Sequence, residues 1–222
     1  MLCLLIGLFP SILAAVSPNR EEGEKLFLEN KPVEARPLLE AAVNEEPGNE
    51  RLYLYLATCW DLLGDPGRAI TILRRGLDVA LEFKDLYYYN MGNDYLRLEE
   101  FAVAEEMFTS AINTNRKLAE GYLNRGNVRL RLSDFQGALA DYGVYLQLNP
   151  NSTQADAVQK VMDLLRSNLA AAEKKKQEDA ERQKALMNQV LSSLSNASED
   201  TKNLSVESIR IKEDSEEIDI KD

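Results

Sequence analysis

Residues 123–151 carry the pattern that decides the fold, and they are LNRGNVRLRLSDFQGALADYGVYLQLNPN. Gly126 and Ala138 are small residues twelve positions apart, and the large side chain of Tyr142 follows Ala138 at a helical spacing of four. Large residues repeated at such spacings form one apolar stripe along a helix. Pro150 closes the stretch, because proline cannot donate the backbone hydrogen bond that a continuing helix needs. The stretch therefore predicts two antiparallel helices that approach closely at their small residues.

The same pattern recurs upstream of this stretch. Ala35, Ala69, Ala104 and Ala138 stand 34, 35 and 34 residues apart. Each is followed four positions later by a large side chain and preceded twelve positions earlier by Gly or Ala. A single hairpin cannot bury both of its faces, so neighbouring hairpins are expected to stack into one continuous core.

This repeat resembles the tetratricopeptide repeat (TPR) family over residues 18–152. The match is clearest in the fourth unit, in Asn124, Gly126, Asp134, Phe135, Gly137, Ala138, Tyr142 and Pro150. The resemblance implies an all-α, right-handed α-solenoid of about four helical hairpins, at about 16–49, 50–84, 85–118 and 119–152. Arg125 and Arg129 depart from the family pattern, which usually has apolar residues at these places. We expect their aliphatic stems to pack while their charged heads reach solvent.

Residues 153–191 are predicted to form a capping helix followed by a charged helical extension. Ala155, Val158, Met162, Leu165 and Leu169 recur at helical spacing, and an array of this kind needs a terminal helix to cover its last apolar face. A second apolar stripe spans residues 186–194. Three interpretations stay open for it, namely packing back on the solenoid, serving as a helical ligand for a partner, or self-association. Residues 192–222 hold nine acidic and four basic side chains, and we predict a disordered acidic tail there.

Residues 1–15 are apolar and uncharged, and small residues stand at their end. This composition is typical of a secretory signal peptide, although no basic residue precedes the apolar run. The sequence therefore predicts an exported protein of the periplasm or cell envelope. An uncleaved N-terminal apolar segment is the alternative, and it would give the chain its only membrane contact.

Composition excludes several classes of function. The 222 residues carry 26 basic and 37 acidic side chains, a net charge of −11, which argues against a nucleic-acid partner. No histidine and only two cysteines are present, so we predict neither a metal site nor a cofactor. Glycine-rich phosphate loops and nucleophile elbows are absent from the sequence, and the chain is expected not to be an enzyme. Cys59 is interpreted as a small buried apolar residue.

The resemblance further implies a concave groove lined by the first helix of each unit. The second unit offers Arg51, Leu54, Thr58, Asp61 and Leu62, and the third and fourth add Leu86 and Glu120 to the candidate site. The candidate partner-binding residues are Tyr89, Asn93, Leu96, Arg97, Leu123, Asn127, Leu130 and Arg131.

We expect Asn93 and Asn127 to hold the backbone of an extended peptide, and Arg97 and Arg131 to bind a carboxylate. Some family members grip chaperone C-termini with a clamp of lysines, asparagines and an arginine. Here Asn93 and Asn124 match that clamp, but Tyr89 replaces a lysine, so this specialised activity is disfavoured.

The predicted function is that of a non-catalytic protein-protein interaction module or assembly scaffold that binds a peptide or helix. The alternative is an accessory subunit of a periplasmic small-molecule or lipid transport system. The sequence identifies neither the partner nor an oligomeric state.

Overall fold

The computed structural model describes the backbone of residues 17–217 and the side chains of residues 17–198. The predicted signal peptide at 1–15 lies outside the described residues, and so do residues 218–222. The chain divides into two compact units, residues 1–162 and residues 163–222. Each unit is described by itself below.

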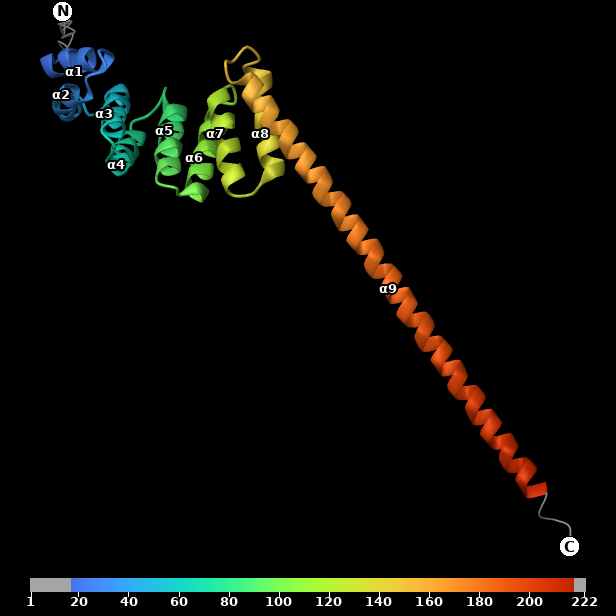
Figure 1. Cartoon of the computed structure of the whole chain (residues 1–222). Helices are drawn as coiled ribbons and strands as arrows, with labels where there is room; N and C mark the ends of the chain where they lie inside the picture. Colours follow the sequence, from blue (N-terminus) through green and yellow to red (C-terminus); the bar gives the residue numbers. More distant parts are fainter. Residues whose placement is uncertain (1–16, 218–222) are drawn as a thin grey trace, which may run out of the picture. The chain divides into compact units, whose positions relative to one another are not determined.

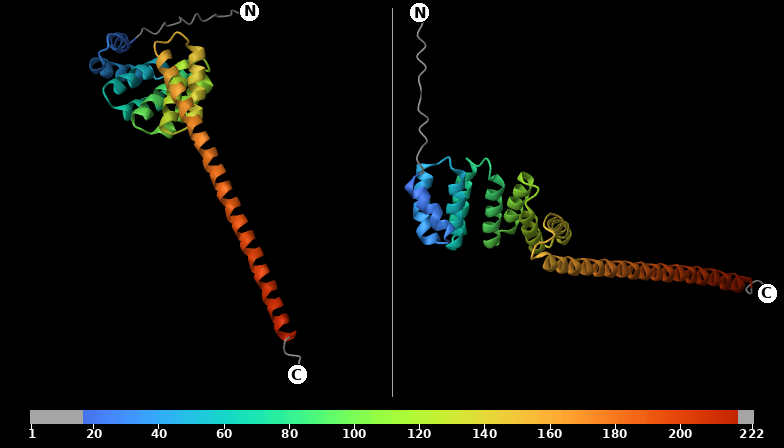
Figure 2. Two further views of the ribbon diagram at one scale, coloured as in Figure 1. Left: turned by 45° about the vertical axis from the view of Figure 1, so that its right-hand side comes forward. Right: turned by 90° about the horizontal axis from the view of Figure 1, so that it is seen from above.

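The first unit is built from helical hairpins that follow one another along the chain (Figures 1 and 2). Their helices are α1 (Pro18–Leu28) with α2 (Pro32–Glu45), α3 (Glu50–Leu62) with α4 (Pro66–Leu77), α5 (Lys84–Arg97) with α6 (Phe101–Thr114), and α7 (Ala119–Arg131) with α8 (Phe135–Leu148). From α1 to α8, consecutive helices contact each other, within hairpins and between them. The predicted all-α solenoid of four hairpins is confirmed.

The turn inside each hairpin repeats with the period of the sequence. Asn30, Gly64, Glu99 and Ser133 all have positive φ, between 58° and 82°. The residue after each of them donates its backbone N–H to the carbonyl five positions earlier, at 2.8–2.9 Å. This bond pairs a carbonyl of the last turn that the helix itself cannot satisfy. One backbone geometry thus reverses the chain in all four hairpins.

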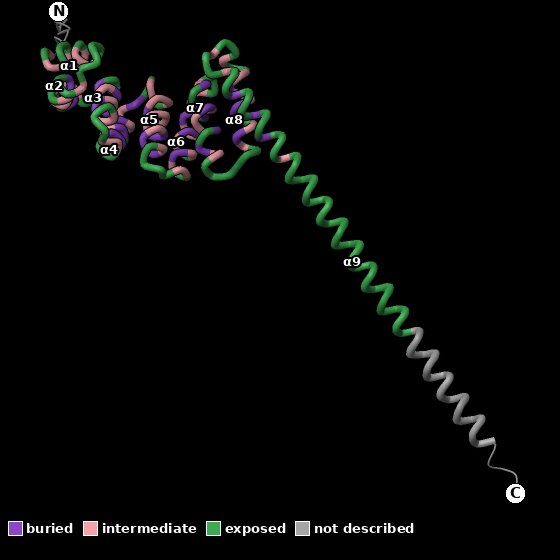
Figure 3. Tube along the Cα trace, viewed as in Figure 1, coloured by how far each residue is buried: buried purple, intermediate pink, exposed green. Residues whose placement is uncertain are grey.

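The core lies between the helices of these hairpins, as the buried segments of Figure 3 show. Ala35, Ala69, Ala104 and Ala138 are each 0% exposed. Gly92 has the same role on a first helix, since an added Cβ would lie 2.7 Å from the ring of Phe108. The small residues that mark the repeat are therefore where the two helices of a hairpin approach most closely.

This close approach predicts opposite effects for two glycine substitutions. Gly92→Ala is expected to destabilise the chain by about 1–3 kcal/mol, because the fully buried Phe108 ring cannot move aside. Gly143→Ala in α8 meets nothing within 4 Å, and it should stabilise the helix by about 0.8–1 kcal/mol. Urea unfolding midpoints measure both changes. Equal midpoint shifts for the two variants would contradict the packing argument.

The period of 35 residues between the second and third units is accommodated in the loop between α4 and α5. The carboxylate of Glu50, at the start of α3, accepts backbone N–H bonds from Leu81 at 2.6 Å, Glu82 at 3.0 Å and Phe83 at 3.4 Å. One side chain therefore orders the loop that carries the extra residue.

The last helix, α9, spans Ala155–Glu217. Within the first unit it buries Val158 and Met162, as expected of a cap. The predicted disordered tail is wrong for residues 192–217, which continue the helix. The last proline of the chain is Pro150 and the last glycine is Gly143, so no strong helix breaker follows residue 155. Charged residues at i,i+4 also support the helix, as in the Lys174–Glu178 pair.

The apolar stripe of residues 186–194 is exposed in the structure. Leu186, Met187, Val190, Leu191 and Leu194 are each 46–62% exposed. Across the described residues, no helix combines the length and the apolar character that crossing a membrane requires.

Candidate functional site

The eight predicted groove residues lie on two neighbouring first helices, α5 and α7. A cavity of about 610 Å³ brings five of them together, and its lining consists of Leu96, Arg97, Glu99, Phe101, Asn127, Leu130 and Arg131. Arg131 is exposed, and it makes neither an ion pair nor a side-chain hydrogen bond within the described part of the chain. Leu123 is only 7% exposed and is absent from the lining of this cavity, so its role as a groove contact stays a prediction. Its side chain packs inward from α7 and belongs to the core.

The two groove asparagines already hold partners within the chain. The Asn93 carbonyl oxygen accepts a hydrogen bond from Asn124 Nδ2 at 2.8 Å, and the Asn127 carbonyl oxygen accepts one from the Tyr142 hydroxyl at 2.8 Å. Asn124 also donates to the Tyr89 hydroxyl at 3.2 Å. The side-chain NH2 groups of Asn93 and Asn127 remain as donors for a ligand. We expected each asparagine to donate one hydrogen bond to a peptide backbone and to accept another from it. The accepting side-chain oxygens of Asn93 and Asn127 already bind Asn124 and Tyr142, so a peptide N–H would have to share them.

A second cavity, of about 320 Å³, lies one repeat upstream between α3 and α5. Its lining consists of Ala57, Thr58, Asp61, Leu73, Asn90, Asn93, Asp94, Leu96 and Arg97. Arg97 takes part in both cavities. Its guanidinium forms an ion pair with Asp61 Oδ1 at 2.7 Å and donates to the Asp61 backbone carbonyl at 3.3 Å. The Arg97 side chain is thus held toward α3, and its guanidinium is already paired with the Asp61 carboxylate.

Asp94 is the most unusual group in this cavity, since it is only 3% exposed. Burial, and then the hydrogen bond and negative charge of Asp61, raise the pKa of Asp94 from 3.8 to about 8, and Arg97 opposes the shift. At neutral pH the Asp94 carboxyl is therefore largely protonated.

The sequence analysis missed Asp94, although a signal for it exists. The equivalent positions in the second and fourth units are Cys59 and Val128, and both are 0% exposed. A carboxylate in a place where neighbouring repeats bury apolar residues marks a buried charge.

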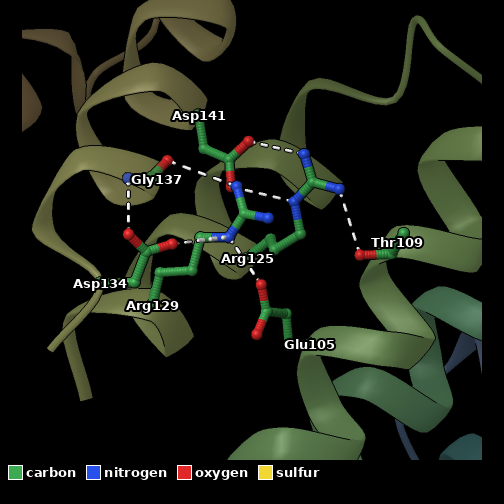
Figure 4. Close-up of polar contacts among 7 residues, drawn as sticks. All are labelled: Glu105, Thr109, Arg125, Arg129, Asp134, Gly137 and Asp141. Carbon is green, nitrogen blue, oxygen red and sulfur yellow. Dashed lines mark hydrogen bonds and ion pairs between the residues drawn. The ribbon is translucent and has the colours of Figure 1, made fainter. Parts of the chain in front are cut away.

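Arg125 and Arg129 do not extend into solvent, and this corrects the expectation for them. Arg125 grips Asp141 with two bonds, Nε to Oδ2 at 2.9 Å and Nη2 to Oδ1 at 2.7 Å (Figure 4). Arg129 Nη1 donates to the same Oδ2 at 2.9 Å. The Asp141 side chain is 4% exposed, and those of Arg125 and Arg129 are 13% and 20% exposed.

This network also joins the third and fourth units. Arg129 Nε donates to Glu105 of α6 at 2.7 Å, and Arg125 Nη1 donates to Thr109 of α6 at 3.1 Å. The heads point inward because Asp141 on α8 supplies a buried counter-charge. The cluster therefore links α6, α7 and α8 and does not face the groove cavities.

Cys59 is fully buried, and burial raises the pKa of its thiol to about 11. The thiol therefore stays protonated at neutral pH and is a poor nucleophile or metal ligand. In the part of the chain that the structure describes, no three side chains of the types His, Cys, Asp or Glu gather as a metal site would require.

Two models of the tetratricopeptide repeat match residues 26–88 and 89–153. RNA polymerase II-associated protein 3 of Xenopus tropicalis is 34% identical over 113 residues, which cover 50% of this chain and 17% of that protein. The match therefore spans only about a sixth of that relative's length.

Two solved structures are similar to the chain. A crystal structure of MamA, 19% identical, has a TM-score of 0.57 and is matched over 72% of this chain and 96% of that one. The first TPR of Spaghetti (RPAP3) bound to the HSP90 peptide SRMEEVD is 26% identical, with a TM-score of 0.50, over 55% of this chain and 93% of that one.

Proposed function

The chain belongs to the tetratricopeptide repeat family, and on that premise we propose that it is a non-catalytic protein-binding module whose groove holds an extended segment of another protein. The observation that carries this proposal is the pair of cavities along α3, α5 and α7, which share Arg97 and mix polar with apolar groups. Such a lining suits a peptide, because apolar surface supplies affinity and a few placed polar groups fix orientation. The peptide-bound RPAP3 structure supports this use of the fold.

Arg131 is the groove residue assigned to an acidic group of the segment. Its guanidinium is exposed and unpaired within the described residues, and it lines the larger cavity beside Asn127 and Leu130. Arginine binds a carboxylate with two parallel N–H bonds, which gives direction as well as affinity. The asparagines that match the chaperone clamp are not assigned to the carboxylate of the segment. Asn124 already donates hydrogen bonds to Asn93 and Tyr89.

Arg131→Ala is expected to weaken capture of acidic peptides about tenfold, which corresponds to one charge-assisted interaction. The probe is a library of random heptapeptides with glutamate fixed at the centre, retained on the full chain and quantified by mass spectrometry. Arg116→Ala is the matched control, since Arg116 is an exposed arginine in the loop between α6 and α7. Equal losses in both variants would point to net charge alone, and no retention by the unaltered chain would overturn the proposed function.

We also propose that the chain acts outside the cytoplasm, in the periplasm or cell envelope. The apolar and uncharged residues 1–15 support this proposal. Cell fractionation of the full chain, with the mature N-terminus read by mass spectrometry, tests it. Recovery of the uncleaved chain in the cytosolic fraction would overturn it.

A further inference from the structure

The exposed apolar stripe of α9 lies in a stretch of helix where no described side chain is buried. Every described residue from 170 to 198 is exposed, and the five large apolar residues of the stripe are among them. Helices in proteins gain most of their stability from an apolar face that packs against another surface. Contiguous apolar surface that stays exposed marks a site of association. The spacing of the stripe and the charges beside it indicate which surface covers it.

The stripe repeats with the period of a coiled coil. A coiled coil carries apolar residues at positions a and d of a seven-residue repeat labelled a to g, so its apolar spacings alternate between three and four. In α9 these positions are taken by Met187, Val190, Leu194 and Ala197. The sequence continues the spacing with the apolar Leu204 and Ile211 at position d, and α9 remains helical over this range. Thr201 and Ser208 stand at position a, and these two polar residues make the second half of the seam weaker than the first.

The residues beside this seam decide which partner fits it. Asp179 stands at position g and Lys184 at position e. In two parallel helices that are in register, each g residue faces the e residue of the other helix five positions further along. A second copy of α9 would therefore set Lys184 opposite Asp179, and Leu191 opposite Leu186. Neither Asp179 nor Lys184 forms an ion pair within the described part of the chain, so both are available to a second copy.

The sequence keeps this division of charge beyond residue 198. Position g holds Asp200 and Glu207, and the only charged residue at position e is Lys212. An antiparallel pair sets g opposite g and e opposite e, which would bring charges of one sign together. The pattern of acidic g and basic e positions is thus complementary to a parallel copy of the same helix. A helix of another protein would not require both signs to be divided in this way on one chain.

We propose that the stretch of α9 from Asp179 to Ile211 forms a parallel, two-stranded coiled coil with the same stretch of a second copy of this chain. The seam buries the apolar stripe, and the flanking g and e residues fix the direction and the register of the two helices. The inference does not depend on the groove. It adds a second interaction surface, and the resulting dimer carries two solenoids.

The mass of the full chain in solution, measured by sedimentation equilibrium, tests the dimer. The unaltered chain is expected at twice the mass of one chain. Val190→Lys sets two ammonium groups opposite each other at position d, so this variant should sediment as a single chain. Ser192→Lys adds the same charge at position f, on the far side of the helix from the seam, and should leave the dimer intact. Residues 190 and 192 are both exposed, and circular dichroism checks that each variant keeps its helices.

Three results of this measurement would overturn the inference. The first is a single mass for the unaltered chain, and the second is a dimer that survives Val190→Lys. The third is a mass of three or more chains, which would exclude the two-stranded form.

A charge exchange tests the parallel direction. Asp179→Lys sets like charges opposite each other at the g–e contact and should weaken the dimer severalfold, and Lys184→Asp should do the same. The two changes combined restore opposite charges, so the dissociation constant should return to that of the unaltered chain. Glu181→Lys, at the outer position b, is the control and should leave the dissociation constant unchanged. A double variant as weak as the single ones would show that these residues do not face each other, and the parallel register would be wrong.

Discussion

Replacing Asp141 with alanine is expected to destabilise the first unit by about 3–5 kcal/mol, which is the usual cost of removing one partner from a buried ion pair. Asp141 accepts bonds from both Arg125 and Arg129, at 2.7–2.9 Å, and its side chain is 4% exposed. The substitution leaves two largely buried guanidinium groups with fewer partners. A loss of this size is a large share of the stability of a typical domain. Urea unfolding followed by circular dichroism measures it.

Two matched variants make this expectation specific. Asp141→Asn keeps the shape and removes the charge, so it should fold with an intermediate loss even where Asp141→Ala does not. Glu105→Gln removes a more exposed partner of Arg129, which still keeps Asp141, and the expected loss is at most about 1 kcal/mol. A loss from Asp141→Ala no larger than that from Glu105→Gln would show that the cluster does not hold α6, α7 and α8 together.

The hairpins could be predicted from the sequence because their packing depends on residue size. Ala104 and Gly92 must be small for α5 and α6 to approach, and Phe108 must fill the space that remains. Such requirements recur in every unit and are visible in one sequence. The sequence predicts helix over residues 153–191 but not over 192–217, because the low apolar content of the second stretch favours disorder. The absence of proline and glycine after Pro150 was the more informative signal.

The polar contacts were harder to predict, because they depend on pairs of residues that are far apart in sequence. Arg125 and Arg129 were recognised as departures from the repeat, but their partner Asp141 was not. Asp141 replaces an apolar residue as well, since Leu38, Ile72 and Met107 stand at the equivalent positions. Charges of opposite sign at core positions of one unit predict a buried ion pair.

The contact of Arg97 at the groove was also hard to predict from the sequence. Its position on the groove face was predicted, but its ion pair with Asp61 depends on the distance between α3 and α5, which the repeat spacing does not give. The same carboxylate-binding role was predicted for Arg131, which has no such neighbour among the described residues.

Asp94 should make the stability of the chain depend on pH in a way that Asp94→Asn removes. Its pKa is about 8 in the folded state, against 3.8 as its ordinary value. Between these values the folded state holds a proton that the unfolded state has lost. Stability should therefore fall as the pH rises through this window, by up to about 1.4 kcal/mol per pH unit. Below about pH 4 and above about pH 8, this contribution no longer changes with pH.

Asparagine carries no titratable proton, so the difference in unfolding free energy between the unaltered chain and Asp94→Asn reports the proton that Asp94 holds beside Asp61. The unaltered chain should lose stability relative to the variant as the pH rises from about 4 to about 8, and the difference should then be constant. Asp78→Asn, at an exposed site, should give a profile parallel to that of the unaltered chain. Parallel profiles for Asp94→Asn as well would mean that Asp94 ionises normally.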